Sequence, residues 1–332
     1  MKSVLTTLLT GASFALLLAG TVSAQTKVVI GHFGDPAPYK AAVADGRLEK
    51  ATGWTIEWRK FNSGAEVNAA MASGGIVISE IGSVPLSAGA STGVDYQLVS
   101  IGKSIVTSES LITRNGAGIE KPADLKGKKV AVPIGSTAHF SLMGALKTFG
   151  LTEKDVQIIG MSPPEIAAAW SQNAIDAAFV WNPVQAKLRE NGKALTTAGE
   201  VAKAGFPTFN GWVVNTKFGA ENRAGVVNFL RVMNEVNGQY TKNKAAWTAD
   251  SPQIKAIAAN VGSTPQDAVA ALDGASYPDG DAQMLPAWMG GGAATTMKAT
   301  ADFLKSAGRI NTVADNYSKF VNADFAKAAA AK

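Results

Sequence analysis

Lys128–Gly150 reads KKVAVPIGSTAHFSLMGALKTFG and contains, in succession, the signals of a strand, a turn and a helix. A short apolar run ends at Pro133, and from Phe140 apolar residues recur at nearly helical spacing until Gly150. Gly135-Ser136-Thr137 lies between the two segments and is the predicted turn. Strands and helices that follow one another in this way build α/β domains, so this stretch indicates the fold class of the chain.

The start of this helix has the properties of an anion-binding site. Ser136 is the predicted N-cap, and the N–H groups of Ala138 and His139 then point back along the helix axis without intrahelical partners. The helix dipole adds partial positive charge, so a sulfonate, phosphate or carboxylate is expected beside Ser136, Thr137 and His139. The alternative is that Ser136 only caps its helix, because a lone Ser-Thr turn lacks the specificity of a complete phosphate-binding loop.

Residues 1–24 have the organisation of a secretory signal peptide. Lys2 supplies the charged start, residues 4–18 are mostly apolar but too few to span a bilayer, and Val22-Ser23-Ala24 is a small-residue cleavage site. Thr21 occupies the position at which a bacterial lipoprotein has its lipid-carrying Cys. The sequence therefore predicts that the chain is exported through a cleavable signal peptide and that the mature protein is soluble and has no lipid anchor.

Composition excludes several classes of function. The chain has no Cys, which rules out a disulfide framework, a thiolate zinc site and a cysteine nucleophile. His32 and His139 are its two histidines and have no metal-ligand spacing, so neither a metal nor another cofactor is expected. The formal net charge of +5 is dispersed, which argues against nucleic-acid binding and mildly favours an anionic ligand.

Strand-like and helix-like segments alternate along the chain in two units. The predicted strands are 27–31, 56–61, 76–81, 96–101 and 111–114, then 130–133, 156–159 and 177–180 in a second unit, and 212–214, which returns to the first. Beyond Thr216 the pattern is mostly helical, and Ala326–Lys332 is a low-complexity tail predicted to fray. This alternation predicts two α/β units, each with a doubly wound, mostly parallel sheet covered on both faces.

Ligands of such sheets bind at the carboxyl ends of the strands, and candidate side chains from both units are expected there. They are Asp35, Ser63, Ser83, Glu109, Ser136, Thr137, His139, Trp181, Asn182, Asn210 and Trp212. Trp181 and Trp212 are predicted either to form an aromatic wall around the ligand or to pack in the core. A site shared between two lobes is what a hinged binding protein requires, because closure buries a small ligand.

Seven blocks of sequence carry a resemblance that covers almost the whole mature chain. They are Trp58–Gly64, Ile81–Leu86, Lys128–Gly150, Pro163–Trp170, Phe179–Pro183, Gly211–Val214 and Asp315–Ser318. In this order they resemble the periplasmic substrate-binding proteins of bacterial taurine ABC transporters, within the wider family of aliphatic-sulfonate, nitrate and thiamine-precursor binding proteins.

This resemblance implies a type II periplasmic binding protein, in which two α/β lobes are joined by a two-segment hinge. Lobe 1 would comprise residues 25–112 and 215–332, and lobe 2 residues 113–214. The resemblance further implies that the protein is a monomer and that it is not an enzyme. It would capture taurine by lobe closure and deliver it to an ABC permease in the inner membrane. The ligand-contacting positions carry over as Ser83, Glu109, Ser136-Thr137 and Trp181-Asn182.

One position departs from the family's pattern. Where the family has Pro-Thr-Leu-Asp, this chain has Pro207-Thr208-Phe209-Asn210, so an amide replaces an expected carboxylate. Loss of that charge weakens recognition of the taurine ammonium by about 1–3 kcal/mol. Glu109 and Asp35 are the acids expected to substitute, although Asp35 can instead simply start an Asp-Pro turn. If neither acid contacts the ligand, the cargo is expected to be a small sulfonate or related anion without an amine, such as an alkanesulfonate.

Enzymatic alternatives have less support. Ser136 and His139 lack an orienting acid and an oxyanion device. A thiamine-pyrimidine synthase, which shares the implied fold, carries a Cys-rich segment that this chain lacks. Among binding proteins, nitrate would not need an acid at Glu109, and a pyrimidine would prefer stacked rings to a Ser-rich helix start. A binding protein that serves a sensor would have the same sequence features.

Overall fold

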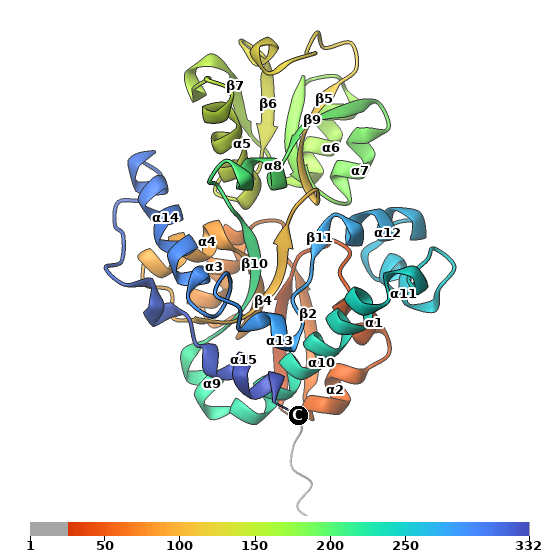
Figure 1. The fold of residues 1–332 in the computed structure, drawn as a ribbon, viewed down its shortest axis with the longest axis vertical. Coiled ribbons are helices and arrows are strands. Elements are labelled where there is room, and N and C mark those ends of the chain that lie inside the picture. The colour runs from red at the N-terminus through yellow and green to blue at the C-terminus, as the bar shows by residue number, and fades with distance from the viewer. Residues whose placement is uncertain (1–25, 332) are drawn as a thin grey trace, which may run out of the picture.

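The computed structural model describes residues 26–331, so the predicted signal peptide at 1–24 lies outside the described residues. Two α/β parts lie one above the other in Figure 1. The lower part contains a six-stranded sheet in the order β11 (Ala275–Ser276), β4 (Gln97–Ile105), β10 (Phe209–Val214), β3 (Ile78–Gly82), β1 (Lys27–His32) and β2 (Thr55–Lys60). The upper part contains a five-stranded sheet in the order β7 (Gln157–Gly160), β6 (Lys129–Val132), β8 (Ala177–Trp181), β5 (Glu109–Arg114) and β9 (Gly192–Thr197).

Helices pack around both sheets. Those of the lower part are α1 (Tyr39–Ala44), α2 (Arg47–Thr52), α3 (Gly64–Ala72), α4 (Ser83–Ser91), α9 (Thr216–Glu221), α10 (Arg223–Lys242), α11 (Pro252–Val261), α12 (Pro265–Asp273), α13 (Gly280–Gln283), α14 (Gly292–Ser306) and α15 (Ala323–Ala330). Those of the upper part are α5 (Thr137–Thr148), α6 (Pro163–Ser171), α7 (Val184–Arg189) and α8 (Ala198–Lys203). Within residues 26–331, no helix combines the length and the apolar character that crossing a membrane requires.

Most strands of each sheet run in one direction. In the first sheet β1 is parallel to β2 and β3, whereas β10 is antiparallel to β3 and β4. In the second sheet β6 is parallel to β7 and β8, and β5 is antiparallel to β8 and β9. The predicted fold class, two α/β lobes with mostly parallel sheets, is confirmed.

Two segments connect the parts. The chain leaves the first sheet after Ile105 and joins the second at Glu109, and it returns between α8 and β10, at residues 204–208. The predicted boundary at 112/113 falls inside β5, and the boundary at 214/215 assigns β10 to lobe 2 although β10 pairs with β3 and β4 of the first sheet. The part to which a strand belongs depends on the strands with which it pairs, and the sequence pattern of a single strand does not reveal its partners. We propose residues 106–108 and 204–208 as the two hinge segments.

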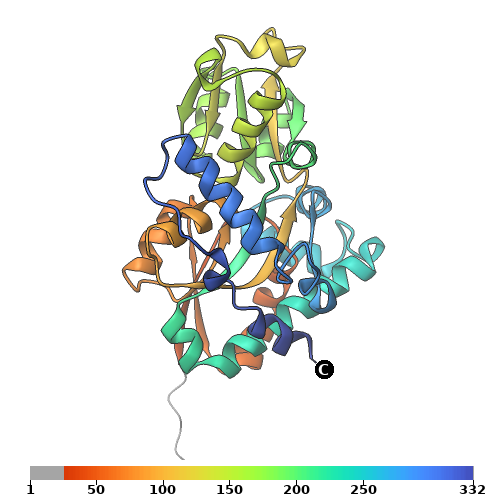
Figure 2. The same cartoon turned by 60° about the vertical axis from the view of Figure 1, so that its left-hand side comes forward.

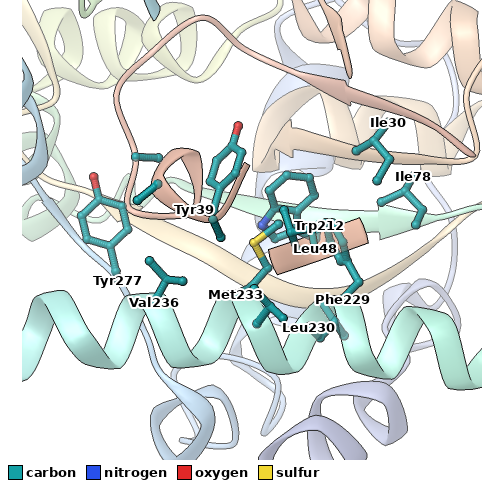
Figure 3. Close-up of a cluster of buried hydrophobic side chains, with 14 of the residues drawn as sticks. Ile30, Tyr39, Leu48, Ile78, Trp212, Phe229, Leu230, Met233, Val236 and Tyr277 are labelled. Carbon is teal, nitrogen blue, oxygen red and sulfur yellow. The ribbon is translucent and has the colours of Figure 1, made fainter. Parts of the chain in front are cut away.

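The largest core lies between the first sheet and the helices packed on it. Trp212 of β10 is buried there, and its ring makes edge-on contacts with Tyr39 and Phe229 at centroid distances of 5.1 and 5.3 Å. Figure 3 shows Trp212 beside Met233 and Leu230 of α10. Burial of these large apolar surfaces is the main force that holds α10 against the sheet. Trp212 therefore packs in the core, and the aromatic wall does not include it.

The sequence pattern missed strand β9 and gave the wrong expectation for the C-terminal tail. β9 escaped prediction because Gly192–Thr197 has neither strict alternation nor an apolar run, yet it pairs with β5 as an edge strand. The tail predicted to fray instead forms most of α15, which packs on α10 and buries Ala326 and Ala329. The small alanine side chains allow this close approach, so a segment of low complexity is ordered by packing.

Candidate functional site

A pocket lies between the two parts, at the ends of strands from both sheets. It encloses about 550 Å³, including the region open to solvent. Its lining includes the predicted residues Asp35, Glu109, Ser136, Thr137, Trp181, Asn182 and Asn210. Phe33, Gly82 and Lys103 also line it and were not predicted. The topology therefore brings together side chains that are dispersed over the sequence.

The N-terminus of α5 forms one wall of the pocket. Ser136 is its N-cap, as predicted: the Ser136 hydroxyl oxygen accepts a hydrogen bond from the His139 N–H at 3.1 Å and its O–H donates to the Pro133 carbonyl at 2.6 Å. The serine hydroxyl is thus already engaged, and the His139 N–H is not free. The first-turn N–H groups of Thr137 and Ala138 have no intrahelical partner and remain suited to an anion.

Glu109 is the first residue of β5 and lies beside this helix start. Its Oε1 accepts a hydrogen bond from the Thr137 hydroxyl at 2.5 Å, while its Oε2 is buried and has no hydrogen-bond partner among the described residues. Burial raises the pKa of Glu109 to about 7, against the opposing effects of Thr137 and of the Lys103 cation. An unpaired, buried carboxylate oxygen is costly, so this position favours a cationic group of a ligand.

Asp35 and Lys103 form a buried ion pair in the same pocket. The Lys103 ammonium donates to Oδ2 of Asp35, and Oδ1 of Asp35 is buried without a partner in the described part of the chain. Burial by itself lowers the pKa of Lys103, but the carboxylates of Asp35 and Glu80 outweigh it and the net shift is upward. Lys103 is therefore cationic. The one available sequence signal was a lysine interrupting the largely apolar strand β4.

Asn210 comes from β10 and is connected to a second buried acid. Its side-chain Nδ2 donates to Oε1 of Glu80 at 2.8 Å, and the Tyr39 hydroxyl donates to Oε2 of Glu80 at 3.3 Å. Burial raises the pKa of Glu80, and the repulsion from Asp35 adds to this, whereas Lys103 and Lys40 act in the opposite direction. Sequence reasoning missed Glu80, because an acid inside a buried strand has no recognisable local motif.

Trp181 and Asn182 line the side of the pocket contributed by the second sheet. The Trp181 ring is tilted against Phe33, with centroids 6.5 Å apart, so two aromatic side chains from different parts meet at the pocket. Oδ1 of Asn182 accepts a hydrogen bond from the Ala186 N–H at 3.1 Å, which leaves the amide NH₂ available to a ligand. Of the two tryptophans considered for an aromatic wall, Trp181 thus lines the pocket, together with Phe33.

Ser83 and His139, both predicted site residues, do not line this pocket. The Ser83 hydroxyl oxygen accepts a hydrogen bond from the N–H of Phe209, the first residue of β10, at 3.3 Å. Nδ1 of His139 accepts from the Gly135 N–H at 3.2 Å, and burial together with the nearby Arg309 cation lowers the pKa of His139 to about 4. The reason is geometric: each side chain projects from the face of its helix that packs inside the protein.

The two parts also touch outside the pocket. α14 extends from the lower part to the upper part (Figure 2), and Phe303 near its end packs edge-on against Phe140 and Phe206 at centroid distances of 5.0 and 6.1 Å. Arg309 and Glu153 form an ion pair across the same boundary at 2.7 Å. These contacts hold the lobes together independently of any ligand.

No group of three or more His, Cys, Asp or Glu side chains within residues 26–331 is arranged to hold a metal ion. The site therefore combines the N–H groups at the start of α5 with the carboxylates of Glu109 and Asp35, the Lys103 ammonium and the Asn210 amide. Donors suited to an anion and acceptors suited to a cation thus line the same pocket. Such an arrangement can bind and orient a small ligand that carries both an anion and a cation.

Comparisons with known proteins agree with this geometry. The profile of the NMT1/THI5-like family matches residues 63–243. The taurine-binding periplasmic protein of Escherichia coli (strain K12) is 34% identical over 319 residues, which cover 96% of this chain and 97% of that protein. A putative aliphatic sulfonates-binding protein of Bacillus subtilis (strain 168) is 31% identical over 203 residues, 60% of each chain.

A solved structure shows the same fold. The alkanesulfonate-binding protein SsuA from Xanthomonas axonopodis pv. citri, bound to MOPS, superposes with a TM-score of 0.74 at 21% identity, over 91% of this chain and all of that one. The taurine-binding relative of Escherichia coli is a binding protein, in agreement with the prediction that this chain is not an enzyme. The chain belongs to the NMT1/THI5-like family, in which it resembles the periplasmic taurine- and sulfonate-binding proteins.

Proposed function

We propose that this chain is the periplasmic solute-binding component of an ABC importer, and that it captures taurine (2-aminoethanesulfonate) between its lobes. Its similarity to the taurine-binding protein of Escherichia coli extends over nearly the whole of both chains, which supports a common cargo. Taurine is a zwitterion whose sulfonate and ammonium are separated by two carbons. The pocket is lined by groups that suit both ends: N–H donors at the start of α5, and the carboxylate oxygens of Glu109 and Asp35.

The observation that carries this proposal is the pair of unpartnered carboxylate oxygens, Oε2 of Glu109 and Oδ1 of Asp35, on residues that line one pocket. An ammonium has three N–H donors and no acceptor, so it can satisfy both oxygens at once. A sulfonate at the first turn of α5 would meet the N–H groups of Thr137 and Ala138 and the positive end of the helix dipole. The two carbons between them would contact the ring of Trp181.

Capture requires the lobes to move. With the hinge segments open, ligand reaches the pocket from water; closure brings the α5 terminus and Glu109 of the upper part against Asp35 and Asn210 of the lower part. The ligand then contributes contacts that exist only in the closed form and shifts the population toward it. The closed form docks, as a monomer, on the permease in the inner membrane, and no chemistry is performed on the ligand.

The cellular location follows from the same proposal. Residues 1–24 act as a cleavable signal peptide, and the mature protein works in the periplasm without a lipid anchor, a cofactor or a nucleic-acid partner. The relative in Escherichia coli is described as periplasmic, which supports this location.

A second candidate is a sulfonate without an amine, such as an alkanesulfonate. One observation favours it: the amide of Asn210 carries no charge of its own, and the carboxylate of Asp35 is already paired with Lys103. A site whose acids are partly neutralised holds an ammonium less strongly, and an anion gains relative to a zwitterion.

Calorimetric titration of the ligand-free mature protein distinguishes the two candidates. Taurine and ethanesulfonate share the sulfonate and the two-carbon body and differ in the amine. We expect taurine to bind at least about tenfold more tightly, since the amine contributes a charge-assisted hydrogen bond. Tighter binding of ethanesulfonate would favour the second candidate, and binding of neither compound would refute both.

A further inference from the structure

Glu80 is a buried carboxylate that does not line the ligand pocket, yet it belongs to the structure beneath it. Only 3% of its surface is exposed, and it lies in β3 opposite Trp212 of the antiparallel strand β10. Because side chains alternate along a strand, Asn210, two residues before Trp212, projects from the same face as Glu80. The two side chains are diagonal neighbours across the strand pair, which is within reach for long polar groups.

The contact between them fixes the orientation of the Asn210 amide. Nδ2 of Asn210 donates to Oε1 of Glu80 at 2.8 Å. Because Oε1 of Glu80 accepts this bond, the amide turns its NH₂ group toward Glu80 and its oxygen away. Glu80 is itself held, because the Tyr39 hydroxyl donates to its other oxygen at 3.3 Å. The amide therefore has one preferred orientation.

The oxygen of Asn210 lies next to the ligand space. Gly82, directly opposite Asn210 in the strand pair, lines the pocket and has no side chain to cover it. A methyl group placed on Gly82 would lie 3.5 Å from Oδ1 of Asn210 and 2.9 Å from Cγ2 of Thr137. The space above Gly82 is thus bounded by the Asn210 oxygen and by the start of α5. A ligand that enters it meets an acceptor and not a donor at position 210.

The charge of Glu80 is balanced locally. Lys103 and Lys40 are the cations whose fields act on Glu80, and Asp35 is the other acid of this cluster. Lys103 lines the pocket and is paired directly with Asp35, whereas the hydrogen-bond donors to the Glu80 carboxylate are the Asn210 amide and the Tyr39 hydroxyl. The family's pattern places a carboxylate at position 210, where this chain has an amide. The carboxylate of Glu80 lies behind this amide and is hydrogen-bonded to it.

We propose that Glu80 is a specificity-determining positioning residue: by orienting the Asn210 amide, it presents a polarised oxygen to the ligand and makes the site prefer an ammonium at this pole. The inference rests on the proposed function, because it assumes that the cargo carries an amine. Glu80 acts through Asn210 and does not touch the ligand. A ligand without an amine gains nothing from the oriented oxygen, so the effect is confined to selectivity.

The test exchanges the two functional groups. Titration calorimetry with taurine and ethanesulfonate compares the wild type, Glu80→Gln, and the double variant Glu80→Gln with Asn210→Asp. The glutamine introduced in the first variant carries an NH₂ group of its own, so the Asn210 amide loses its fixed orientation. We expect the taurine Kd to rise at least about tenfold and the ethanesulfonate Kd to change by less than about threefold. The double variant restores an acid–amide pair in reversed order, and its taurine Kd should return to within about threefold of the wild type.

The matched control is Glu165→Gln, which removes one negative charge from an exposed cap of α6, outside the residues that line the pocket. It should leave both Kd values unchanged. Equal losses for both ligands in Glu80→Gln, or a folded double variant that stays as weak for taurine as the single variant, would overturn the inference while leaving the proposed function intact. A wild type that fails to bind taurine would overturn both. If Glu80→Gln does not fold, as judged by thermal unfolding without ligand, the double variant is compared directly with the wild type, and loss of its taurine preference refutes the inference.

Discussion

Ionisation of Glu109 should control the pH dependence of taurine binding. Burial raises the pKa of Glu109 to about 7 in the ligand-free protein, and an ammonium beside its free Oε2 would favour the charged form. Below that pKa a proton must therefore leave before taurine binds in the proposed way. The taurine Kd should rise by up to about tenfold for each pH unit below 7, which at pH 5 amounts to about 3 kcal/mol of lost binding free energy.

The same group should make a contribution to the stability of the ligand-free protein that falls as the pH rises. The folded state keeps the proton on Glu109 up to about pH 7, whereas the unfolded chain releases it near the ordinary value of 4.5. Between these values the folded state binds more protons, so the contribution to the free energy of unfolding falls as the pH increases, by about 3 kcal/mol over the whole window. Glu109→Gln removes this dependence, and its stability relative to the wild type should increase by that amount from pH 4.5 to pH 7.

Calorimetry between about pH 5 and pH 7.5 tests both statements, with urea unfolding of the ligand-free protein beside it. His32 and His139 stay neutral in the folded state over this range, because burial lowers the pKa of each to about 4. In the unfolded chain they titrate near 6.5 and make stability rise with pH, so only the difference between the wild type and Glu109→Gln isolates the contribution of Glu109. Ethanesulfonate is the control ligand and should show a much weaker pH dependence, and Glu109→Gln should bind taurine with a flat profile. A flat profile for taurine with the wild type, or the same slope for both ligands, would refute the reasoning.

Three further substitutions have distinct expected results. Ser136→Ala removes the N-cap of α5 and should lower the free energy of unfolding by about 1 kcal/mol in urea, while weakening taurine and ethanesulfonate alike; an unchanged stability would contradict the capping role. Phe303→Ala removes the ring that joins α14 to the upper part, so both ligands should weaken by the same factor and the ligand-free protein should expand in small-angle scattering; an altered ratio of the two affinities would be unexpected. Lys103→Met leaves Asp35 buried without its cation and should cost about 3–5 kcal/mol of stability, and retention of wild-type stability in urea would count against the ion pair.

Local signals predicted the parts of the site that a short stretch of chain builds by itself. Ser136 caps α5, because a capping hydroxyl needs only a neighbour three residues away; Ser63, also a candidate site residue, caps α3 and does not line the pocket. Asn182 was found because it follows a predicted strand, and Glu109 because it lies just before one and matches a ligand-contacting position of the family. Convergence of strand ends is a property of the fold class, so it could be inferred before the structure was known.

Other residues of the site could not be inferred in this way. Lys103 and its partner Asp35 are 68 residues apart, and Glu80 and Asn210 are 130 residues apart. Each of these contacts depends on which strands are neighbours in the sheet. Ser83 and His139 had the right position along the chain but project from the packed face of their helices, which the predicted helix bounds did not reveal.

The sequence by itself determined the α/β class, the two-lobed organisation, the order of most elements and the absence of cysteine chemistry. These follow from periodicity, from capping residues and from composition, all of which act over a few neighbouring residues. Only the tertiary structure decided which polar atoms remain unpaired in the pocket and which acid orients Asn210. Such pairings arise when β3, β4 and β10 come together, because a buried charge takes whichever partner the sheet brings within hydrogen-bond distance.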